Sequence, residues 1–323
     1  MFGVRTDLAL EARELYMQEA GEEVPGVEVE NAGDESIKIT RVKVTDEQGE
    51  KAIGKKRGNY ITLEMPGMSE NNAGFSESCA LALSDELARL VQGGENTVTL
   101  VVGLGNSKIT PDSLGPRTVS NLLVTRHLFS HVEGFDGEGL ASVCALAPGV
   151  LGITGMETGE VIRGVAEKIK PDMIIAVDAL ASRSIDRLNK TVQIADTGIN
   201  PGSGVGNHRQ AISFETLGVP VIAIGVPMVI DAATVANDTI DKVIDSIVNR
   251  NCQSPVCDTF RNIDREEKHR LIREVVPAGA GGLMVTSTDI DSVAHRVSKV
   301  VANGINLCLH KGITLQEING FLV

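Results

Sequence analysis

Two aspartates carry the strongest chemical signal in this sequence. Asp178 directly follows the apolar run 173–177, which is typical of a fully buried strand. Asp112 lies in the loop that follows a second strand-like run at 97–102. Because ligands of open α/β sheets bind beyond the carboxyl ends of the strands, we expect both side chains at such an edge.

A pair of neighbouring carboxylates can perform hydrolysis. Two carboxylates held close together do not both ionise easily, so one keeps a proton and acts as an acid while the other acts as a base on water. Such a pair can hydrolyse an amide bond without a metal ion or a covalent intermediate. The alternative is structural, because aspartates at strand ends often cap the next helix. The residues themselves leave both interpretations open.

Composition narrows the class of protein. The 323 residues suffice for one large α/β domain or two modest ones. A net charge of −13 argues against direct nucleic-acid binding, and no apolar stretch is long enough for a membrane span. Five cysteines without metal-ligand spacing indicate free thiols in a reducing cytoplasm. The one compact basic run, 55–57, is predicted to be a solvated loop tip.

Hydrophobic periodicity predicts the elements that must position the aspartates. Residues 20–70 are predicted to form an antiparallel β appendage, because 26–30 and 37–44 alternate polar and apolar positions and a further strand is expected at 60–64. A first helix, capped by Thr6 or Asp7, is expected before it. Strands are then expected at 97–102, 173–177, 191–195, 219–225 and 283–285, and helices at 76–92, 116–129, 158–170, 231–249, 264–276 and 289–303. The prediction is a single α/β domain over 1–323, with a largely parallel sheet flanked by helices.

Other motifs point away from cofactors. The loop after Gly103 lacks the third glycine of a dinucleotide fingerprint, since Lys108 stands there. The glycine-rich segment 202–206 lacks the frame of a nucleophile elbow, so we expect Gly202 and Gly204, like Gly105, to let backbone approach a substrate. His127 and His131 are four residues apart, but a surface role is favoured over metal binding. No metal or cofactor is predicted.

Several stretches, in order along most of the chain, carry a family resemblance. They include Val102-Gly-Leu-Gly-Asn106, Thr110-Pro-Asp112, Ala176-Val-Asp178-Ala-Leu-Ala-Ser-Arg183, Asp196-Thr-Gly198 and Pro201-Gly-Ser-Gly-Val-Gly-Asn207. With them the sequence resembles the germination protease (spore endopeptidase) family of endospore-forming bacteria. The resemblance implies an endopeptidase that degrades small acid-soluble spore proteins during germination. It also implies a homotetramer, made as a self-processing zymogen in the cytoplasm of the forespore and spore core.

The resemblance also assigns residues. The family's two essential aspartates fall on Asp112 and Asp178. The family's fold is similar to that of hydrogenase-maturation endopeptidases, which use nickel, so a metal-dependent peptidase is one alternative. A non-enzymatic ligand-binding α/β module is another.

A processing site is implied near the N-terminus. The family cleaves the pattern Thr, an acid, an aliphatic or aromatic residue, Ala, a variable residue and Glu, and residues 6–11 fit it. The scissile bond then joins Asp7 to Leu8, which makes 1–7 a candidate propeptide. Because a helix is expected here, the site could be masked within it until activation.

Overall fold

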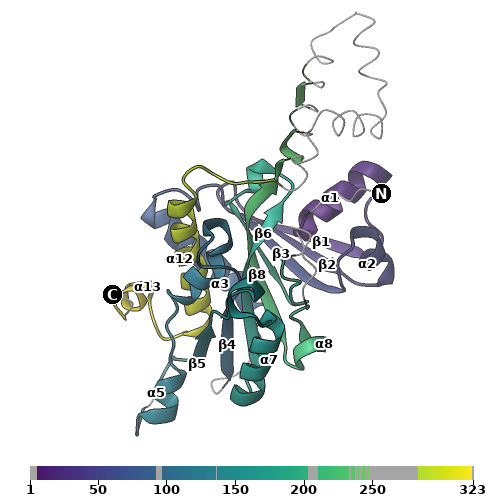
Figure 1. The fold of residues 1–323 in the computed structure, drawn as a ribbon. Helices are drawn as coiled ribbons and strands as arrows, with labels where there is room; N and C mark the ends of the chain where they lie inside the picture. The colour runs from purple at the N-terminus through teal and green to yellow at the C-terminus, as the bar shows by residue number, and fades with distance from the viewer. Residues whose placement is uncertain are drawn as a thin grey trace, which may run out of the picture.

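The computed structural model of the chain describes residues 6–91, 97–135, 137–202, 210–232 and 283–321, with a few single positions between 234 and 246. The strands of these ranges form one mixed sheet in the order β1-β2-β3-β7-β8-β6-β4-β5, with β9 paired to β8 (Figure 1).

The centre of the sheet is parallel. Strands β5 (Ser142–Leu146), β4 (Val98–Gly103), β6 (Met173–Ser182) and β8 (Val221–Asp231) lie side by side and run in the same direction. Three of them confirm strands predicted from buried runs, whereas β5 was not anticipated. Strand β8 also continues past the predicted end at residue 225, to Asp231.

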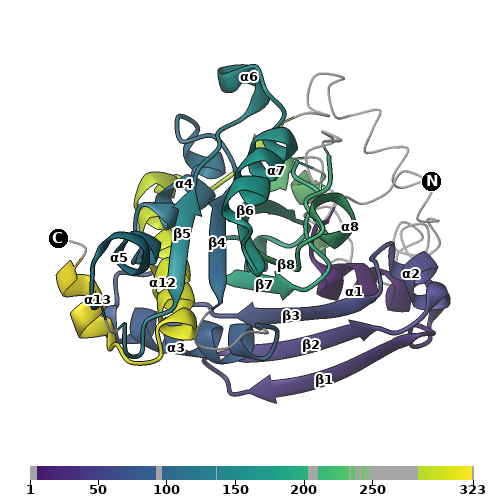
Figure 2. The same ribbon diagram turned by 90° about the horizontal axis from the view of Figure 1, so that it is seen from below.

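The other pairings are antiparallel, so the prediction of a largely parallel sheet is wrong. Strands β1 (Val27–Gly33), β2 (Lys38–Val44), β3 (Gly58–Glu64) and β7 (Thr191–Ala195) follow one another antiparallel, and β7 is antiparallel to β8 (Figure 2). The physical reason lies between β6 and β7. The connection 183–190 is shorter than the dozen or more residues of a parallel crossover, so the chain must return antiparallel. Strand β9 (Met284–Val285) is also antiparallel to β8.

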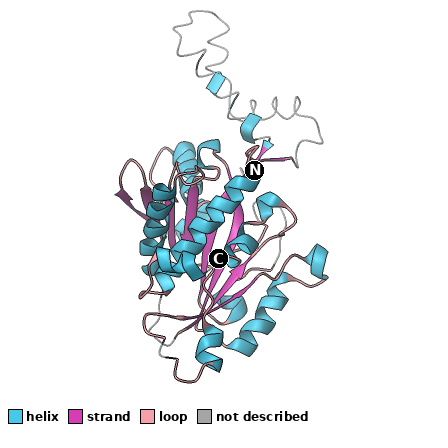
Figure 3. Ribbon diagram, turned by 90° about the vertical axis from the view of Figure 1, so that its left-hand side faces the viewer, coloured by secondary structure: helices cyan, strands magenta, loops and turns pink. Residues whose placement is uncertain are grey.

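Helices cover both faces of the sheet (Figure 3). Because alternate strand residues point to opposite faces, Val101 and Ile175 pack with α3 (Ala73–Ala88) and α12 (Ile290–Leu309). Leu100 and Ile174 pack on the other side, against α7 (Thr158–Ile169). On this second face α1 (Ala9–Ala20) and α2 (Glu47–Ile53) cover the strands from β1 to β3. The shorter elements are η1 (Thr110–Asp112), α4 (Leu114–Val119), α5 (Arg126–His131), α6 (Leu151–Thr154), η2 (Ile185–Arg187), α8 (Phe214–Leu217) and α13 (Leu315–Phe321).

Some predicted helix boundaries are wrong. The helix expected at 116–129 is two helices, α4 and α5. Thr125 separates them, because its hydroxyl donates to the Ala141 carbonyl at 2.5 Å and accepts from the Val143 amide, which ties the chain to β5. The N-cap position of the first helix is Leu8 rather than Thr6 or Asp7, and no side chain caps this helix. The helix predicted at 264–276 and most of that at 231–249 lie outside the described residues. None of the described helices is long and apolar enough to cross a membrane.

Candidate active site

The two predicted aspartates lie near the end of β4, but the expectation that Asp178 ends its own strand is wrong, because β6 continues to Ser182 alongside β8. Strands β4 and β6 pair in register up to Gly103 and Val177, and the Leu104 amide then donates to the Val177 carbonyl at 2.8 Å. Asp178 comes next on β6. Its side chain is 5% exposed, and one carboxylate oxygen accepts the Ala179 amide at 2.9 Å. The carboxylate is therefore held just beyond the carboxyl end of β4, in the middle of β6.

Asp112 reaches the same edge by a tight loop. The Asn106 amide donates to both the main-chain oxygen and a carboxylate oxygen of Asp112, each at 2.9 Å. Gly105 has a φ of +111°, and a Cβ atom there would lie 2.1 Å from the Asp112 carbonyl oxygen. Only glycine allows this approach of the two backbone segments.

One cavity of about 720 Å³ connects these residues. Its walls include Asp112, Asp178, Gly105 and Gly202, and Gly204 lies outside the described residues. The structure thus places both predicted aspartates and two of the three predicted glycines at one cavity. Their roles in substrate binding and catalysis stay predictions.

The N-terminal segment enters the same cavity. Thr6 and Asp7 line it. The Asp7 amide donates to the Ala181 carbonyl at 3.2 Å, and the Ala181 amide donates to the Asp7 carboxylate at 2.9 Å, so this segment lies along β6 beyond Asp178. Leu8 has extended backbone angles and is fully buried. The bond between Asp7 and Leu8 therefore precedes the helix, whereas the last three residues of the pattern, 9–11, form its first turn.

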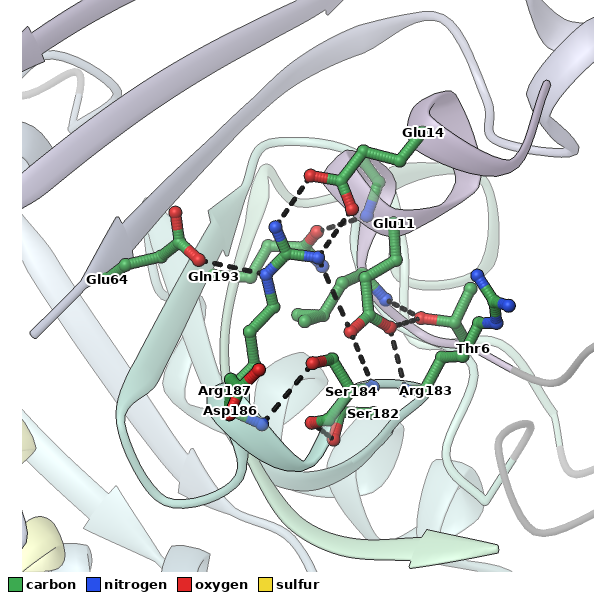
Figure 4. Close-up of polar contacts among 12 residues, drawn as sticks. Thr6, Glu11, Glu14, Glu64, Ser182, Arg183, Ser184, Asp186, Arg187 and Gln193 are labelled. Atoms are coloured by element: carbon green, nitrogen blue, oxygen red, sulfur yellow. Dashed lines mark hydrogen bonds and ion pairs between the residues drawn. The ribbon is translucent and has the colours of Figure 1, made fainter. Parts of the chain in front are cut away.

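Glu11 anchors this segment through its side chain (Figure 4). It is 1% exposed and accepts the main-chain amides of Arg183 at 2.8 Å and Ser184 at 3.1 Å, together with the hydroxyl of Thr6. Arg187 lies 3.6 Å from it. The first and last positions of the predicted cleavage pattern, residues 6 and 11, are therefore joined to each other and to the end of β6.

Arg187 lies among three carboxylates (Figure 4). Besides Glu11, it makes two bonds of 2.6 Å to Glu14 and one of 2.9 Å to Glu64. Burial acts to lower the pKa of Arg187, but the hydrogen bonds to Glu14 and Glu64 outweigh it and raise that pKa. This cation fastens α1 to β3 and to the turn after β6.

Two residues that sequence reasoning missed contact the N-terminal segment. Lys55 was assigned to a solvated tip, but its ammonium group lies against the Asp7 carbonyl, whereas the side chains of Lys56 and Arg57 are 55% and 63% exposed. Gln193 lies within β7 and is 8% exposed. An amide in the middle of a buried strand was a usable signal for Gln193, whereas the basic run offered none for Lys55.

The described cysteines and histidines lie elsewhere. Cys79, Cys144 and Cys308 are free thiols. His127 and His131 are both on α5 and exposed. In the part of the chain that the structure describes, no three His, Cys, Asp or Glu side chains are grouped so that they could hold a metal ion. Cys252 and Cys257 lie outside that part.

A mixed α/β fold in which two aspartates and the chain's own N-terminal segment line one cavity beyond the end of β4 has the architecture of an α/β enzyme with its site at that cavity. The family model for germination protease matches residues 7–255 and 245–322. The germination protease of Clostridium tetani is 48% identical over 320 residues, covering 99% of each chain, and that of Caldanaerobacter subterraneus is 49% identical, covering 100% of this chain and 99% of its own. The germination protease of Priestia megaterium is 39% identical, covering 99% and 97%. The chain therefore belongs to the germination protease family, and it is a peptidase of spore germination.

Proposed function

We propose that this peptidase cleaves its substrates with a water molecule that Asp112 and Asp178 activate. The observation that carries the proposal is their position on the walls of one cavity that also contains Asp7, the first residue of the candidate processing bond. A carboxylate pair beside a peptide has the groups that amide hydrolysis requires, namely a base for water and an acid for the leaving nitrogen.

The proposed reaction needs no covalent intermediate. One carboxylate takes a proton from water as the water oxygen attacks the carbonyl carbon, and the electron pair of the C=O bond moves to oxygen. The other carboxyl group, protonated, gives its proton to the amide nitrogen. The C–N bond then breaks, the carbonyl re-forms, and a carboxylic acid and an amine leave.

We further infer that the enzyme is made as a zymogen that cleaves itself between Asp7 and Leu8. Residues 6–11 carry the cleavage pattern of the family's substrates, and Thr6 and Asp7 line the cavity in the uncleaved chain. By the same pattern, small acid-soluble spore proteins are its substrates in the spore core. We also propose that the enzyme is a homotetramer and that its core is similar to that of the hydrogenase-maturation endopeptidases.

Conservative amide substitutions test the aspartate pair. Asp112→Asn and Asp178→Asn should each reduce cleavage of a peptide containing Thr-Glu-Ile-Ala-Ser-Glu by about 1,000-fold or more, because the amide can neither accept nor donate the transferred proton. N-terminal sequencing of the activated wild type should find Leu8. Asp172→Asn is the matched control, since Asp172 lies just before β6 at the opposite edge and binds the Val98 amide at 2.7 Å.

Near-normal cleavage in either site variant would refute the pair. An intact Met1 in fully active enzyme would refute the processing bond. Activity that a chelator removes and that nickel or zinc restores would contradict the metal-free mechanism.

A further inference from the structure

The carbonyl oxygen of Asp7 has two side-chain donors. The Lys55 ammonium donates to it at 2.8 Å, and the Gln193 side-chain amide donates to it at 3.2 Å. This oxygen belongs to the peptide bond between Asp7 and Leu8. The two donors therefore polarise the same carbonyl that the proposed reaction attacks.

Gln193 spans that peptide bond. Its Oε1 atom accepts the amide of Ala9 at 2.6 Å while its Nε2 group donates to the Asp7 carbonyl. Because the Ala9 amide can only donate, the side-chain amide has a single orientation that satisfies both contacts. One glutamine thus holds the backbone on each side of Leu8.

The sheet directs Gln193 and Asp178 to the same face. Each is in register with Gly225 of β8, so the three residues form one row across β7, β8 and β6. With neighbouring strands about 4.8 Å apart, the α-carbons of Gln193 and Asp178 are about 10 Å apart. A peptide held by Gln193 therefore lies over the same face as the candidate catalytic carboxylate.

Lys55 reaches this face from α2. The helix ends at Ile53, the next residue Gly54 has a φ of +66°, a left-handed conformation that turns the chain back, and Lys55 follows directly. Its ammonium group donates to two main-chain oxygens, those of Asp7 at 2.8 Å and Thr6 at 3.5 Å. Burial lowers the pKa of Lys55, and the charges of Asp7 and Glu11 oppose that shift only in part. Lys55 is half-buried, and a cation that is partly shielded from water stabilises a developing negative charge more strongly than a fully solvated one does.

We propose that Lys55 and Gln193 form the oxyanion-binding site of this peptidase. They hold the carbonyl oxygen of Asp7 during self-processing, and then the equivalent oxygen of each substrate. When the water oxygen bonds to the carbonyl carbon, the C=O electron pair moves to the oxygen between Lys55 Nζ and Gln193 Nε2. It returns when the C–N bond breaks. This assignment rests on the proposed aspartate mechanism, because the two donors perform no proton transfer themselves.

The test measures the first-order rate at which the full chain acquires Leu8 as its N-terminus, and kcat per processed chain for the Thr-Glu-Ile-Ala-Ser-Glu peptide. Lys55→Met should reduce both by about 100-fold or more, as the loss of one oxyanion donor does in other peptidases. Gln193→Glu keeps an acceptor for the Ala9 amide and loses the donor, so a reduction of about 10-fold to 100-fold is expected. Lys51→Met and Gln48→Glu, on the exposed side of α2, are the matched controls and should behave as wild type.

The pH profile separates this role from a structural one. If protonated Lys55 is required, the processing rate falls with rising pH as this group loses its proton. Because burial lowers the pKa of Lys55, this fall should begin at a pH below the ordinary lysine pKa. Lys55→Arg should restore part of the rate and move the alkaline limb to higher pH, because arginine stays charged. An unchanged limb in Lys55→Arg overturns the proposal.

The two proposals fail separately. If Lys55→Met and Gln193→Glu keep processing rates within twofold of wild type while Asp112→Asn is inactive, the oxyanion-binding site is wrong and the aspartate mechanism stands. If Asp112→Asn is active, the aspartate mechanism itself fails. Urea unfolding of each variant verifies folding, and if Lys55→Met does not fold, the Gln193→Glu rate and the Lys55→Arg profile decide the question.

Discussion

Substitution of Gly105 by alanine tests the position of Asp112. The new Cβ atom would lie 2.1 Å from the Asp112 carbonyl oxygen, whereas ordinary contacts begin at 3.4 Å, so the two loop segments must separate by about 1.3 Å. A displacement of about 1 Å in a catalytic group can cost about 100-fold in rate. A φ of +111° adds backbone strain, at about 1–2 kcal/mol for a residue with a side chain. We therefore expect Gly105→Ala to lose about 100-fold in kcat and to unfold at a lower urea concentration.

Gly155→Ala is the control for backbone strain. Gly155 has a φ of +71°, and nothing lies within 4 Å of its Cβ position. It should lose stability with kcat unchanged, which separates strain from displacement. Both variants are assayed with the pattern peptide and by urea unfolding. If Gly105→Ala retains kcat within twofold of Gly155→Ala, the close packing of this loop does not position Asp112 for catalysis, and the reasoning is wrong.

Three further predictions follow from buried groups. Arg187→Met should reduce the free energy of unfolding by about 2–3 kcal/mol in urea titrations, somewhat less than a fully buried pair, because two of its three glutamate partners are partly open to water. Burial lowers the pKa of His310, so the unfolded chain binds a proton before the folded chain does as the pH falls below 6.5. The free energy of unfolding should therefore decrease between pH 6.5 and the lower pKa of the folded state. His310→Gln should remove this dependence of stability on pH. Burial raises the pKa of Cys79 and of Cys308 to about 12. Iodoacetamide at neutral pH should therefore leave both thiols of the folded chain unlabelled, as measured by mass spectrometry. The half-buried Cys144 should react sooner.

Each of these has a control or a contradicting result. Arg13→Met breaks an ion pair whose partner Glu23 is 70% exposed and should cost under about 1 kcal/mol, so equal losses for the two arginines would contradict the first prediction. His310 accepts the Ala141 amide and faces the Leu123 carbonyl, and an identical pH slope in wild type and His310→Gln would show that these contacts do not exclude its proton. Labelling of Cys79 as fast as in urea would contradict its burial.

Local patterns predicted the strands that matter for the site. The buried run before Asp178 is the first half of β6, and the run before the Asp112 loop is β4. Their prediction succeeded because fully buried parallel strands have continuous apolar sequences, a property that each segment carries independently of its neighbours. The alternation within β1 could be recognised for a related reason, since one face of this strand is more buried than the other.

Sequence patterns failed where a remote contact decides the local structure. The predicted helix at 116–129 divides because Thr125 bonds to the main chain next to β5. The direction of β7 depends on a connection too short for a crossover. The sequence predicts Lys55 at the surface because lysines in charged loops are usually exposed. Nothing nearby in the sequence indicates the Asp7 carbonyl that it binds.

The sequence by itself determined that two aspartates follow two buried apolar runs, and it carried the motifs that identify the family. Buried apolar runs are local properties, so the position of both aspartates next to the central strands was predictable. Only the tertiary structure decided that Asp112, Asp178 and Asp7 share a cavity, and that Lys55 and Gln193 meet at one carbonyl oxygen. Strand order and register bring these residues together, and both depend on which segments pack against each other rather than on the pattern of any single segment.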